Sequence, residues 1–401
     1  MFPLGMSVEQ ESMEPKGQED VMSVTKFAIP EIIFGQDSLA YVGPYARRNG
    51  ARRVLLVSDK GLEEAGWVEK VIDALDREGL AWVYFNTVDS DPRDFQIKQG
   101  AEFYLRQRAD VIVALGGGSP MDTAKGIALI ASNGGQIRDY EGANRIQKPL
   151  PPMLCIPTTA GSGADISQFA IITDVDRQVK MAIISRTLVP NITLIDPSFL
   201  HTKPEWLIIA SAIDALTHAV EAYVSIIASP FTEMQSLKAV ELILNNLEQA
   251  VNTRSGKSLS QLSTASTIAG MAFSNAGLGI DHAIAHSLGG KHDVMHGLVH
   301  PTLLPAVMRF NLPCCVHKMG VIGRLITGEQ NASDQKAAEK GISALEAFFS
   351  RFTIPLRLRH LVSDASGLPE VCQLAVQDAC VLTNPRPVTW QECLQICEDV
   401  W

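Results

Sequence analysis

The first half of the chain alternates short apolar runs with helix-periodic segments. The runs are rich in leucine and β-branched residues, and each ends at a polar or glycine-containing turn. They are "RRVLLVSD" (52–59), "AWVYFN" (81–86), "ADVIVALGGGS" (109–119), "PMLCIPTT" (152–159) and "NITLIDP" (191–197). Segment 62–79, between the first two runs, is expected to be helical. Continuous apolar strands separated by helices are typical of a parallel sheet covered on both faces. The pattern predicts an open α/β domain.

After Pro204 the hydrophobic period changes to that of long helices. Segments 204–225, 231–251 and 258–276 are helix-periodic with few strand signals, and Pro204 suits the first turn of a helix. We therefore expect an α/β domain over residues 23–203 and an all-α domain over residues 204–401. Residues 1–22 have no apolar period, and we expect them to form a mobile tail.

Charge and cysteine content exclude several classes of protein. The formal net charge is −10, and a nucleic-acid or membrane-surface role needs a basic face. The seven cysteines have no CxxC spacing, which favours reduced thiols in the cytoplasm over a disulfide framework. The apolar stretch 206–228 is interrupted by Asp214, His218 and Glu221, so we expect a buried helix there and no membrane span.

A glycine-rich loop stands at a predicted strand-to-helix junction, in "ALGGGSPMDTAK" (114–125). Its glycines let the backbone approach a ligand closely, and the free N–H groups of the helix start favour an anion such as a pyrophosphate. The GxGxxG fingerprint is incomplete, because Met121 stands where the third glycine belongs. A turn needed only for chain reversal is the alternative.

A second loop of small residues, "PTTAGSGAD" (157–165), follows another predicted strand and offers the hydroxyls of Thr158, Thr159 and Ser162. Two such loops at the carboxyl ends of strands suit a dinucleotide lying across the sheet edge. Asp59 ends an earlier strand, where a carboxylate would accept from ribose hydroxyls and repel a 2′-phosphate. This position favours NAD over NADP, and a helix-capping role for Asp59 is the alternative.

Two regions carry residues that bind metals. Asp214 and His218 are four apart on a predicted helix with apolar neighbours, so both side chains lie on one face. A buried carboxylate needs compensation, which a divalent cation supplies, although an i, i+4 pair on a helix surface is the alternative.

The other region, 280–300, holds five of the nine histidines of the chain. We expect Gly289 and Gly290 to break a helix there and turn the last histidines back toward the first. Carboxylate and imidazole together suit Fe(II), Zn(II), Mn(II) or Co(II), but spacing alone does not select the ligands. These histidines are His282, His286, His292, His296 and His300.

Seven motifs, in this order and spacing, carry a resemblance to a known family. The chain resembles the iron-dependent (group III) alcohol dehydrogenases from about residue 26 to its end. The resemblance implies a dinucleotide-binding α/β domain followed by a helical domain, a fold similar to that of dehydroquinate synthase. The motifs are "GGGSPMDTAK", "PTTAGSGAD", "ITDVDRQVKMAI", "DALTHAVEAY", "GIDHAIAHSLGGKHDVMHG", "LLPAVMRFN" and "NPRPVT".

The resemblance also implies roles for individual residues. The metal ligands would be Asp214, His218, His282 and His296, and His286 would relay a proton. Phe273 and Leu278 fall where family members line the alcohol pocket. The dinucleotide would be bound by Asp59, Gly117, Gly118, Ser119, Asp122, Thr158, Thr159, Ser162 and Lys180.

Some positions depart from the family pattern. His292 and the "VHP" at 299–301 are less typical, since many members have Asn-Ala after the "HG" motif. His292 and His300 therefore stay without an assigned role, and we expect structural or pocket-wall positions for them. Glu221, one turn after His218, is a candidate to orient the ligands.

These observations lead to one hypothesis and two alternatives. The hypothesis is reversible oxidation of a primary alcohol or diol to an aldehyde, with NAD and one divalent metal per chain, Fe(II) before Zn(II). The first alternative is a dehydroquinate synthase-like lyase with NAD and a metal, which would need a basic pocket. The second is a non-catalytic scaffold. We expect a homodimer or larger homo-oligomer, and neither nucleic acid nor membrane as a partner.

Overall fold

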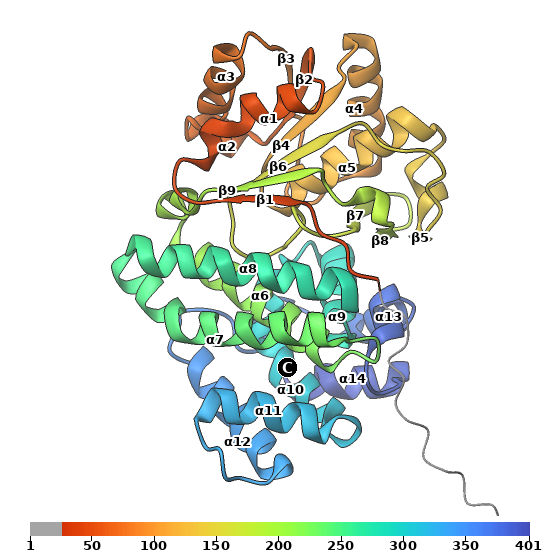
Figure 1. Cartoon of the computed structure of the whole chain (residues 1–401). Helices are drawn as coiled ribbons and strands as arrows, with labels where there is room; N and C mark the ends of the chain where they lie inside the picture. The colour runs from red at the N-terminus through yellow and green to blue at the C-terminus, as the bar shows by residue number, and fades with distance from the viewer. Residues whose placement is uncertain (1–25) are drawn as a thin grey trace, which may run out of the picture.

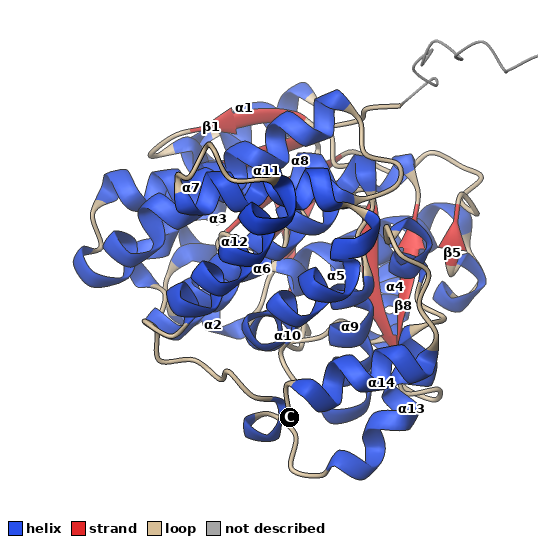
Figure 2. Ribbon diagram, turned by 90° about the horizontal axis from the view of Figure 1, so that it is seen from below, coloured by secondary structure: helices blue, strands red, loops and turns tan. Residues whose placement is uncertain are grey.

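The computed structural model describes residues 26–401, so the tail expected at 1–22 lies outside the described residues. Figure 1 shows an α/β part, coloured red to yellow, above a helical part coloured green to blue. The predicted fold class is confirmed. In Figure 2 the labelled strands all belong to the first part of the chain.

The main sheet is parallel throughout and has the strand order β1-β9-β6-β4-β2-β3. The chain moves from β2 to β3 in one direction and then from β4 onward in the other. The strand order therefore reverses between β2 and β4, and ligands of open α/β sheets bind at such a point. The strands are β1 (Glu31–Phe34), β2 (Arg53–Val57), β3 (Ala81–Phe85), β4 (Val111–Gly116), β6 (Met153–Pro157) and β9 (Ile192–Ile195). The five predicted strands are confirmed, and β1 was not predicted.

Helices cover both faces of this sheet, because successive side chains of a buried strand point to opposite faces. In β2, Val54 and Leu56 pack in the apolar cluster that contains α1 and α3, whereas Leu55 and Val57 pack with α4 and α5. The five helices are α1 (Val42–Arg48), α2 (Lys60–Glu64), α3 (Trp67–Arg77), α4 (Asp94–Gln107) and α5 (Gly118–Asn133). The segment expected to be helical at 62–79 forms parts of two helices, because Gly66 has a φ of 75° and separates α2 from α3.

A small second sheet stands beside α5 and was not predicted as strands. Its order is β5-β8-β7, and β7 and β8 form an antiparallel hairpin. Ala170 and Ile172 of β7 are buried together with Ile97 and Leu129 of the flanking helices. The strands are β5 (Gly142–Ala143), β7 (Phe169–Asp174) and β8 (Val179–Ile184).

The helical part begins at Glu205, directly after Pro204. By length and composition α6 would suffice to cross a membrane, but 89% of its apolar window is buried inside the fold, as expected from the sequence. The helices are α6 (Glu205–Val224), α7 (Pro230–Thr253), α8 (Gly256–Ala276), α9 (Ile280–His292), α10 (His296–Asn311), α11 (Val316–Thr327), α12 (Asp334–Phe349), α13 (Leu368–Ala375) and α14 (Trp390–Asp399).

The turn in the histidine-rich segment is not where the sequence predicted it. Helix α9 continues through Gly289 and Gly290 and ends at His292, and Asp293 follows with a φ of 55°. The glycines allow close packing against the β7–β8 hairpin. A Cβ on Gly289 would lie 2.8 Å from Lys180 Nζ, and one on Gly290 would lie 3.1 Å from a hairpin carbonyl oxygen.

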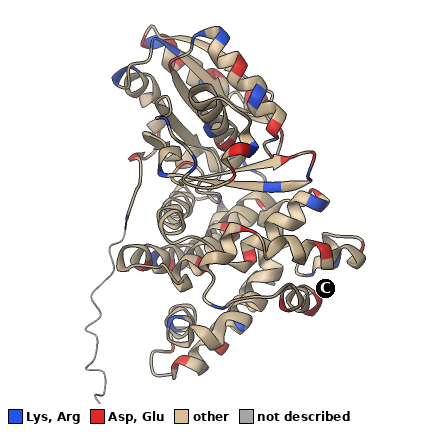
Figure 3. Cartoon of the chain, turned by 90° about the vertical axis from the view of Figure 1, so that its right-hand side faces the viewer, with Lys and Arg blue, Asp and Glu red and all other residues tan. Residues whose placement is uncertain are grey.

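Charged side chains lie mainly on the outer elements. Figure 3 shows Lys and Arg interspersed with Asp and Glu there, whereas the helices at the centre of the lower part carry few charges. Examples are the surface ion pairs Arg309–Glu346 and Arg351–Glu248. Exposed pairs of this kind contribute little to stability.

Thiol reactivity should single out Cys314. All seven cysteines are free; Cys314 is exposed, its neighbour Cys315 is partly buried, and the other five are buried. Burial raises the pKa of Cys315 to about 12, so at pH 8 it stays a thiol, which is a poor nucleophile. Iodoacetamide at pH 8 is expected to modify Cys314 first, as peptide mass spectrometry would show. Equal labelling of both cysteines would contradict this prediction.

Candidate metal and cofactor site

Three helices bring one aspartate and five histidine side chains toward the centre of the helical part. Asp214 and His218 are one turn apart on α6, as predicted, and both are buried. Helix α9 carries His282 and His286 one turn apart. Helix α10 begins at His296, which is half-buried, and carries the fully buried His300 one turn later.

The Asp214 carboxylate is the common neighbour of four imidazoles. Its Oδ1 atom lies 3.2 Å from Nε2 of His300, 3.5 Å from that of His282 and 3.7 Å from that of His218. Its Oδ2 atom lies 3.8 Å from Nε2 of His296. Two ligands bound at 2.0–2.1 Å to one tetrahedral ion lie about 3.4 Å apart. The spacing is that expected between donors sharing one cation.

Several of these polar atoms have no hydrogen-bond partner although they are buried. They include Asp214 Oδ1 and the Nε2 atoms of His282 and His300. An unpaired buried polar atom costs free energy, and a bound cation would remove that cost. The donor set, one carboxylate with several imidazoles and no thiolate, suits Fe(II) or Zn(II). The residues present therefore fit a divalent metal.

The protonation states of three of the four imidazoles at neutral pH also suit metal binding. Burial would lower the pKa of the fourth, His300, but the carboxylates of Asp281 and Asp214 raise it to about 10, so this ring must lose a proton to bind a metal. Burial lowers the pKa of His218 to about 3, that of His282 to about 4 and that of His296 to about 3. Although burial alone would raise it, the surrounding imidazoles hold the pKa of Asp214 well below its usual range. Neutral imidazoles and an ionised carboxylate are the forms that bind a metal.

Glu221 fixes the orientation of His282. Its Oε2 atom lies 2.6 Å from His282 Nδ1, and its Oε1 atom accepts a hydrogen bond of 2.8 Å from the Asp281 backbone N–H. Burial raises the pKa of Glu221 to about 7. Because Nδ1 is engaged, Nε2 is the ring nitrogen that faces Asp214. This contact agrees with the orienting role suggested for Glu221 by the sequence.

His286 stands beside the cluster and pairs with Asp378. The distance from His286 Nδ1 to Asp378 Oδ2 is 2.9 Å. Burial opposes ionisation of Asp378, but the charge and hydrogen bond of His286 lower its pKa to about 2. An ionised carboxylate only accepts, so Nδ1 carries a proton, and in the neutral form of the ring Nε2 is the free acceptor. Sequence reasoning missed Asp378, which precedes the short helix 379–383, 92 residues after His286, in no motif.

Other predicted residues lie at different distances from the cluster. Phe273 stacks on the His218 ring at 4.2 Å between centroids, which places it beside the site. Leu278 is buried in the apolar cluster of α9, α13 and α14. The His292 ring lies beside Gly367, away from Asp214.

The predicted dinucleotide loops face each other at the edge of the main sheet. Strands β2 and β4 pair directly, so Asp59 and the glycine loop follow adjacent strand ends. A Cβ on Gly117 would lie 3.3 Å from Thr159 Oγ1, and one on Gly118 would lie 3.4 Å from Ser162 Cβ. The two loops are therefore close enough to contact one ligand.

Some of the predicted dinucleotide residues have partners within the protein. Asp59 Oδ1 accepts a hydrogen bond of 2.9 Å from Leu62 N, so the carboxylate caps α2, the alternative weighed for it. The Thr158 backbone N–H donates to the Gly116 oxygen at 2.9 Å, which joins the two loops. The Ser119 hydroxyl donates to a backbone oxygen of the β3–α4 connection.

Asp122 and Lys180 bond to neighbouring elements. Asp122 Oδ2 accepts a hydrogen bond of 3.1 Å from Ile171 N, which ties α5 to β7, and burial raises the pKa of Asp122 to about 6. Lys180 Nζ donates to Asp91 Oδ1 at 2.8 Å while packing against Gly289. Lys180 thus connects the α/β part with helix α9.

A groove of about 790 Å³ lies elsewhere, between α10, α12 and α14. None of the predicted site residues lines it. A much smaller cavity reaches Thr158 and Thr159 from the side of α8.

Comparisons with known proteins cover nearly the whole described chain. Residues 30–197 match the family model "Iron-containing alcohol dehydrogenase", and residues 208–401 match "Fe-containing alcohol dehydrogenase family, C-terminal". The NAD-dependent methanol dehydrogenase of Bacillus methanolicus is 36% identical, over 94% of this chain and 100% of its own. The 1,3-propanediol dehydrogenase of Klebsiella pneumoniae is 36% identical, over 92% of this chain and 97% of its own. A crystal structure of 1,3-propanediol oxidoreductase superposes with a TM-score of 0.92 at 35% identity. The match covers 94% of this chain and 100% of that chain.

Proposed function

The chain belongs to the iron-containing alcohol dehydrogenase family, and on this premise we propose that it interconverts a small primary alcohol or diol and its aldehyde. It is an NAD-linked oxidoreductase of that family, with an iron-type metal site. One observation carries the proposal: an ionised, buried carboxylate that lies beside the Nε2 atoms of His282 and His300, both without a hydrogen-bond partner. Family membership favours this function over the lyase and scaffold alternatives.

We propose that Asp214, His218, His282 and His296 hold the divalent metal, Fe(II) foremost. The bound metal supplies a Lewis acid that lowers the pKa of the alcohol hydroxyl, while NAD supplies the hydride acceptor. The four side chains come from α6, α9 and α10, whose buried packing keeps their donor atoms in place. Phe273, stacked on His218, excludes water from one side of the site.

His286 is the proposed proton carrier. Its Nδ1–H donates to the ionised Asp378, which leaves Nε2 free to accept the proton of the alcohol. The pair also stabilises the imidazolium that results, because the negative charge of Asp378 lies 2.9 Å from the ring nitrogen. Asp378 is thus a positioning residue for His286.

We propose that the dinucleotide lies across the ends of β2 and β4. Free backbone N–H groups at the start of α5 favour the pyrophosphate, and Asp59 is in position for the adenosine ribose. Lys180 packs against Gly289 of α9, on the side of the helical part. The full proposed set is Asp59, Gly117, Gly118, Ser119, Asp122, Thr158, Thr159, Ser162 and Lys180.

A substrate panel with metal analysis tests the function. Protein purified and loaded anaerobically with Fe(II) should hold about one equivalent per chain, and primary alcohols, diols and aldehydes should change the NADH absorbance. Turnover should disappear on chelation and return with the metal. Stoichiometric metal without NAD-linked turnover on any of these compounds would contradict the proposal.

The Asp59→Ser variant tests the preference for NAD. Serine is a good N-cap, so α2 keeps its cap while the carboxylate is lost. The ratio of kcat/KM for NAD over NADP is expected to fall by about tenfold, equal to about 1.4 kcal/mol of lost discrimination. Asp59→Gly should lower the same ratio and should also lower the Tm of the protein. An unchanged ratio in both variants would remove Asp59 from coenzyme selection.

We also propose a homo-oligomer, a homodimer at least, in the cytoplasm. Exposed apolar side chains gather on neighbouring segments, including Phe231 and Met234 of α7, and Phe27 packs against Phe231. An exposed apolar patch of this kind is typical of an interface. Seven free cysteines suit a reducing compartment. Sedimentation of the purified protein tests the oligomeric state.

A further inference from the structure

His300 contacts the proposed metal site although the family pattern gives it no role there. Its side chain is fully buried on α10, one turn after His296. Of the four imidazole nitrogens around Asp214, Nε2 of His300 is the nearest, at 3.2 Å from Oδ1.

Asp281 fixes the ring of His300 in the orientation of a metal ligand. Asp281 is fully buried, and its Oδ1 atom lies 2.5 Å from His300 Nδ1. Nε2 is therefore the nitrogen that faces the cluster. A carboxylate on the far nitrogen of a histidine ring is the usual support of a metal-binding histidine. The pair repeats the arrangement of Glu221 with His282, and Asp281 and His282 are neighbours on α9.

The contact between His300 and Asp214 is close but is not a hydrogen bond. Nε2 of His300 and Oδ1 of Asp214 are both without a hydrogen-bond partner despite their separation of 3.2 Å. The N–H direction thus does not point at the oxygen. Two polar atoms in this relation fit ligands directed at one shared ion, which would take the place of the proton on Nε2.

We propose that His300 is an additional protein ligand of the divalent metal, held in place by Asp281. The inference rests on the proposed function, since it needs the metal site formed by Asp214, His218, His282 and His296. Five protein donors leave room for the alcohol as a sixth. Fe(II), Mn(II) and Co(II) accept six ligands more readily than Zn(II), which prefers four. The extra histidine would therefore disfavour zinc.

Cobalt substitution tests this proposal without measuring turnover. The protein and its His300→Asn variant are loaded with Co(II), and the visible d–d bands are compared, since these bands grow stronger as the number of ligands falls. We expect weak bands in the unaltered protein and stronger bands in the variant. Competition between Fe(II) and Zn(II) should shift toward zinc by about tenfold in the variant. His292→Asn, in the same segment but away from Asp214, should change neither result.

The possible outcomes distinguish a failure of the His300 proposal from a failure of the metal site itself. If the unaltered protein takes up no Co(II), the proposed function fails and this inference with it. If it takes up Co(II) and His300→Asn leaves both spectrum and selectivity unchanged, only the role of His300 is overturned. Should His300→Asn not fold, Asp281→Asn keeps the histidine and weakens its support. It should shift the spectrum in the same direction by a smaller amount, and an unchanged spectrum there would overturn the proposal.

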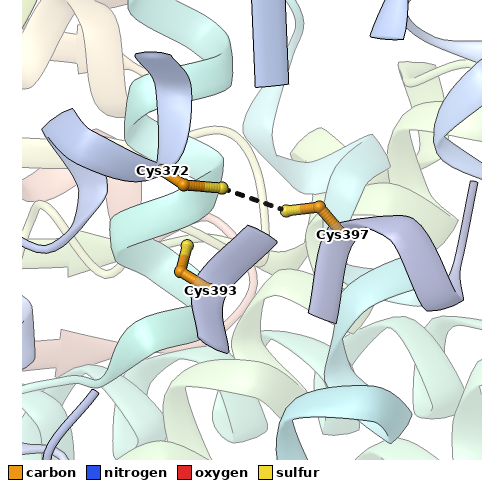
Figure 4. Close-up of side chains that lie close together, drawn as sticks. All are labelled: Cys372, Cys393 and Cys397. Atoms are coloured by element: carbon orange, nitrogen blue, oxygen red, sulfur yellow. Dashed lines mark hydrogen bonds between the residues drawn. The ribbon is translucent and has the colours of Figure 1, made fainter. Parts of the chain in front are cut away.

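A second, independent observation lies at the end of the chain, where three thiols meet. Figure 4 shows Cys372 of α13 facing Cys393 and Cys397, which are one turn apart on α14. All three are fully buried, their sulfur atoms lie within 4.8 Å of one another, and the Cys372–Cys397 distance is 3.8 Å. Three sulfurs bound to one ion in a plane at 2.3 Å lie about 4.0 Å apart.

We propose that Cys372, Cys393 and Cys397 form a site for a single Cu(I) ion. Thiolates select soft cations, and the site has three ligands where a structural zinc needs four. The thiol protons leave as the ion binds.

Copper binding is measured anaerobically in a Cys314→Ser/Cys315→Ser background, which removes the other adjacent pair of thiols. Cu(I) is supplied from a chromogenic chelator, and one equivalent should transfer to this protein. Cys397→Ala should lose that equivalent, whereas Cys155→Ala, at a buried cysteine of strand β6, should keep it. Equal uptake by the two variants, or no uptake by the background protein, would overturn the copper site. Thermal melting of each apoprotein confirms that it is folded.

Discussion

Asp214→Asn is expected to abolish metal binding and to lower alcohol oxidation by about 1000-fold or more. The carboxylate touches the imidazoles of His218, His282, His296 and His300, so its charge acts on the whole ligand set. The neutral amide of asparagine has the same side-chain volume but is a much weaker metal ligand than a carboxylate. A metal Lewis acid contributes several kcal/mol, and each 1.4 kcal/mol is tenfold in rate.

The variant should stay folded without the metal. Asp214 is a buried carboxylate whose Oδ1 atom has no partner, so removing its charge does not cost the apoprotein a hydrogen bond there. Added Fe(II) should raise the Tm of the unaltered protein and leave that of Asp214→Asn unchanged, because only the former binds it. His282→Ala should also lose the metal. His317→Ala, at an exposed histidine of α11, is the matched control.

A normal metal content in Asp214→Asn would show that the metal binds elsewhere in the protein. Fe(II) per chain is measured after desalting, next to NADH formation with the best alcohol of the panel. Loss of activity with full metal content would instead give Asp214 a role in orienting the histidines.

The fold could be predicted because its signals are local. Buried parallel strands are continuous apolar runs, and long helices repeat every 3.6 residues, so β2, β4, β6 and β9 and the start of α6 follow from the pattern. The hairpin of β7 and β8 was missed because apolar residues occupy both its buried and its partly buried positions, so the sequence does not alternate between apolar and polar residues. The helix split at Gly66 depends on one left-handed residue.

The site could be predicted in part. Spacing of four along a helix identified the pair Asp214–His218, since that spacing is fixed by helix geometry. The partners of these residues come from elsewhere in the chain: Asp378 reaches His286 across 92 residues, and no local pattern announces it. The position of His300 depends on the axis of α10 relative to α6.

Gly289 and Gly290 were predicted to end a helix, and the structure shows why that prediction was wrong. Glycine in a helix is a common signal of its end, and the sequence contains no sign of the hairpin that packs there. Close approach of Lys180 and Gln178 explains the glycines, and α9 therefore continues to His292. The turn is made instead by Asp293, which tolerates a left-handed conformation.

Gly118→Leu is expected to weaken NAD binding by about 100-fold while leaving the metal site intact. Gly118 begins α5, and a Cβ there would lie 3.4 Å from Ser162 Cβ, an ordinary contact. A leucine would extend into the space between the two loops, where we place the pyrophosphate, and would block its approach to the free N–H groups. The KM for NAD should rise by about 100-fold, equal to about 2.7 kcal/mol of lost binding.

Gly118→Ala is the matched control, because its single methyl group meets Ser162 at a normal distance and should raise the KM only slightly. NAD binding is measured by titration calorimetry and Fe(II) content by metal analysis on the same samples. Full metal with weakened NAD binding in Gly118→Leu separates the two halves of the site, since the cluster around Asp214 is built on α6, α9 and α10. Unchanged affinity for NAD in Gly118→Leu would mean that the dinucleotide does not pass between these loops.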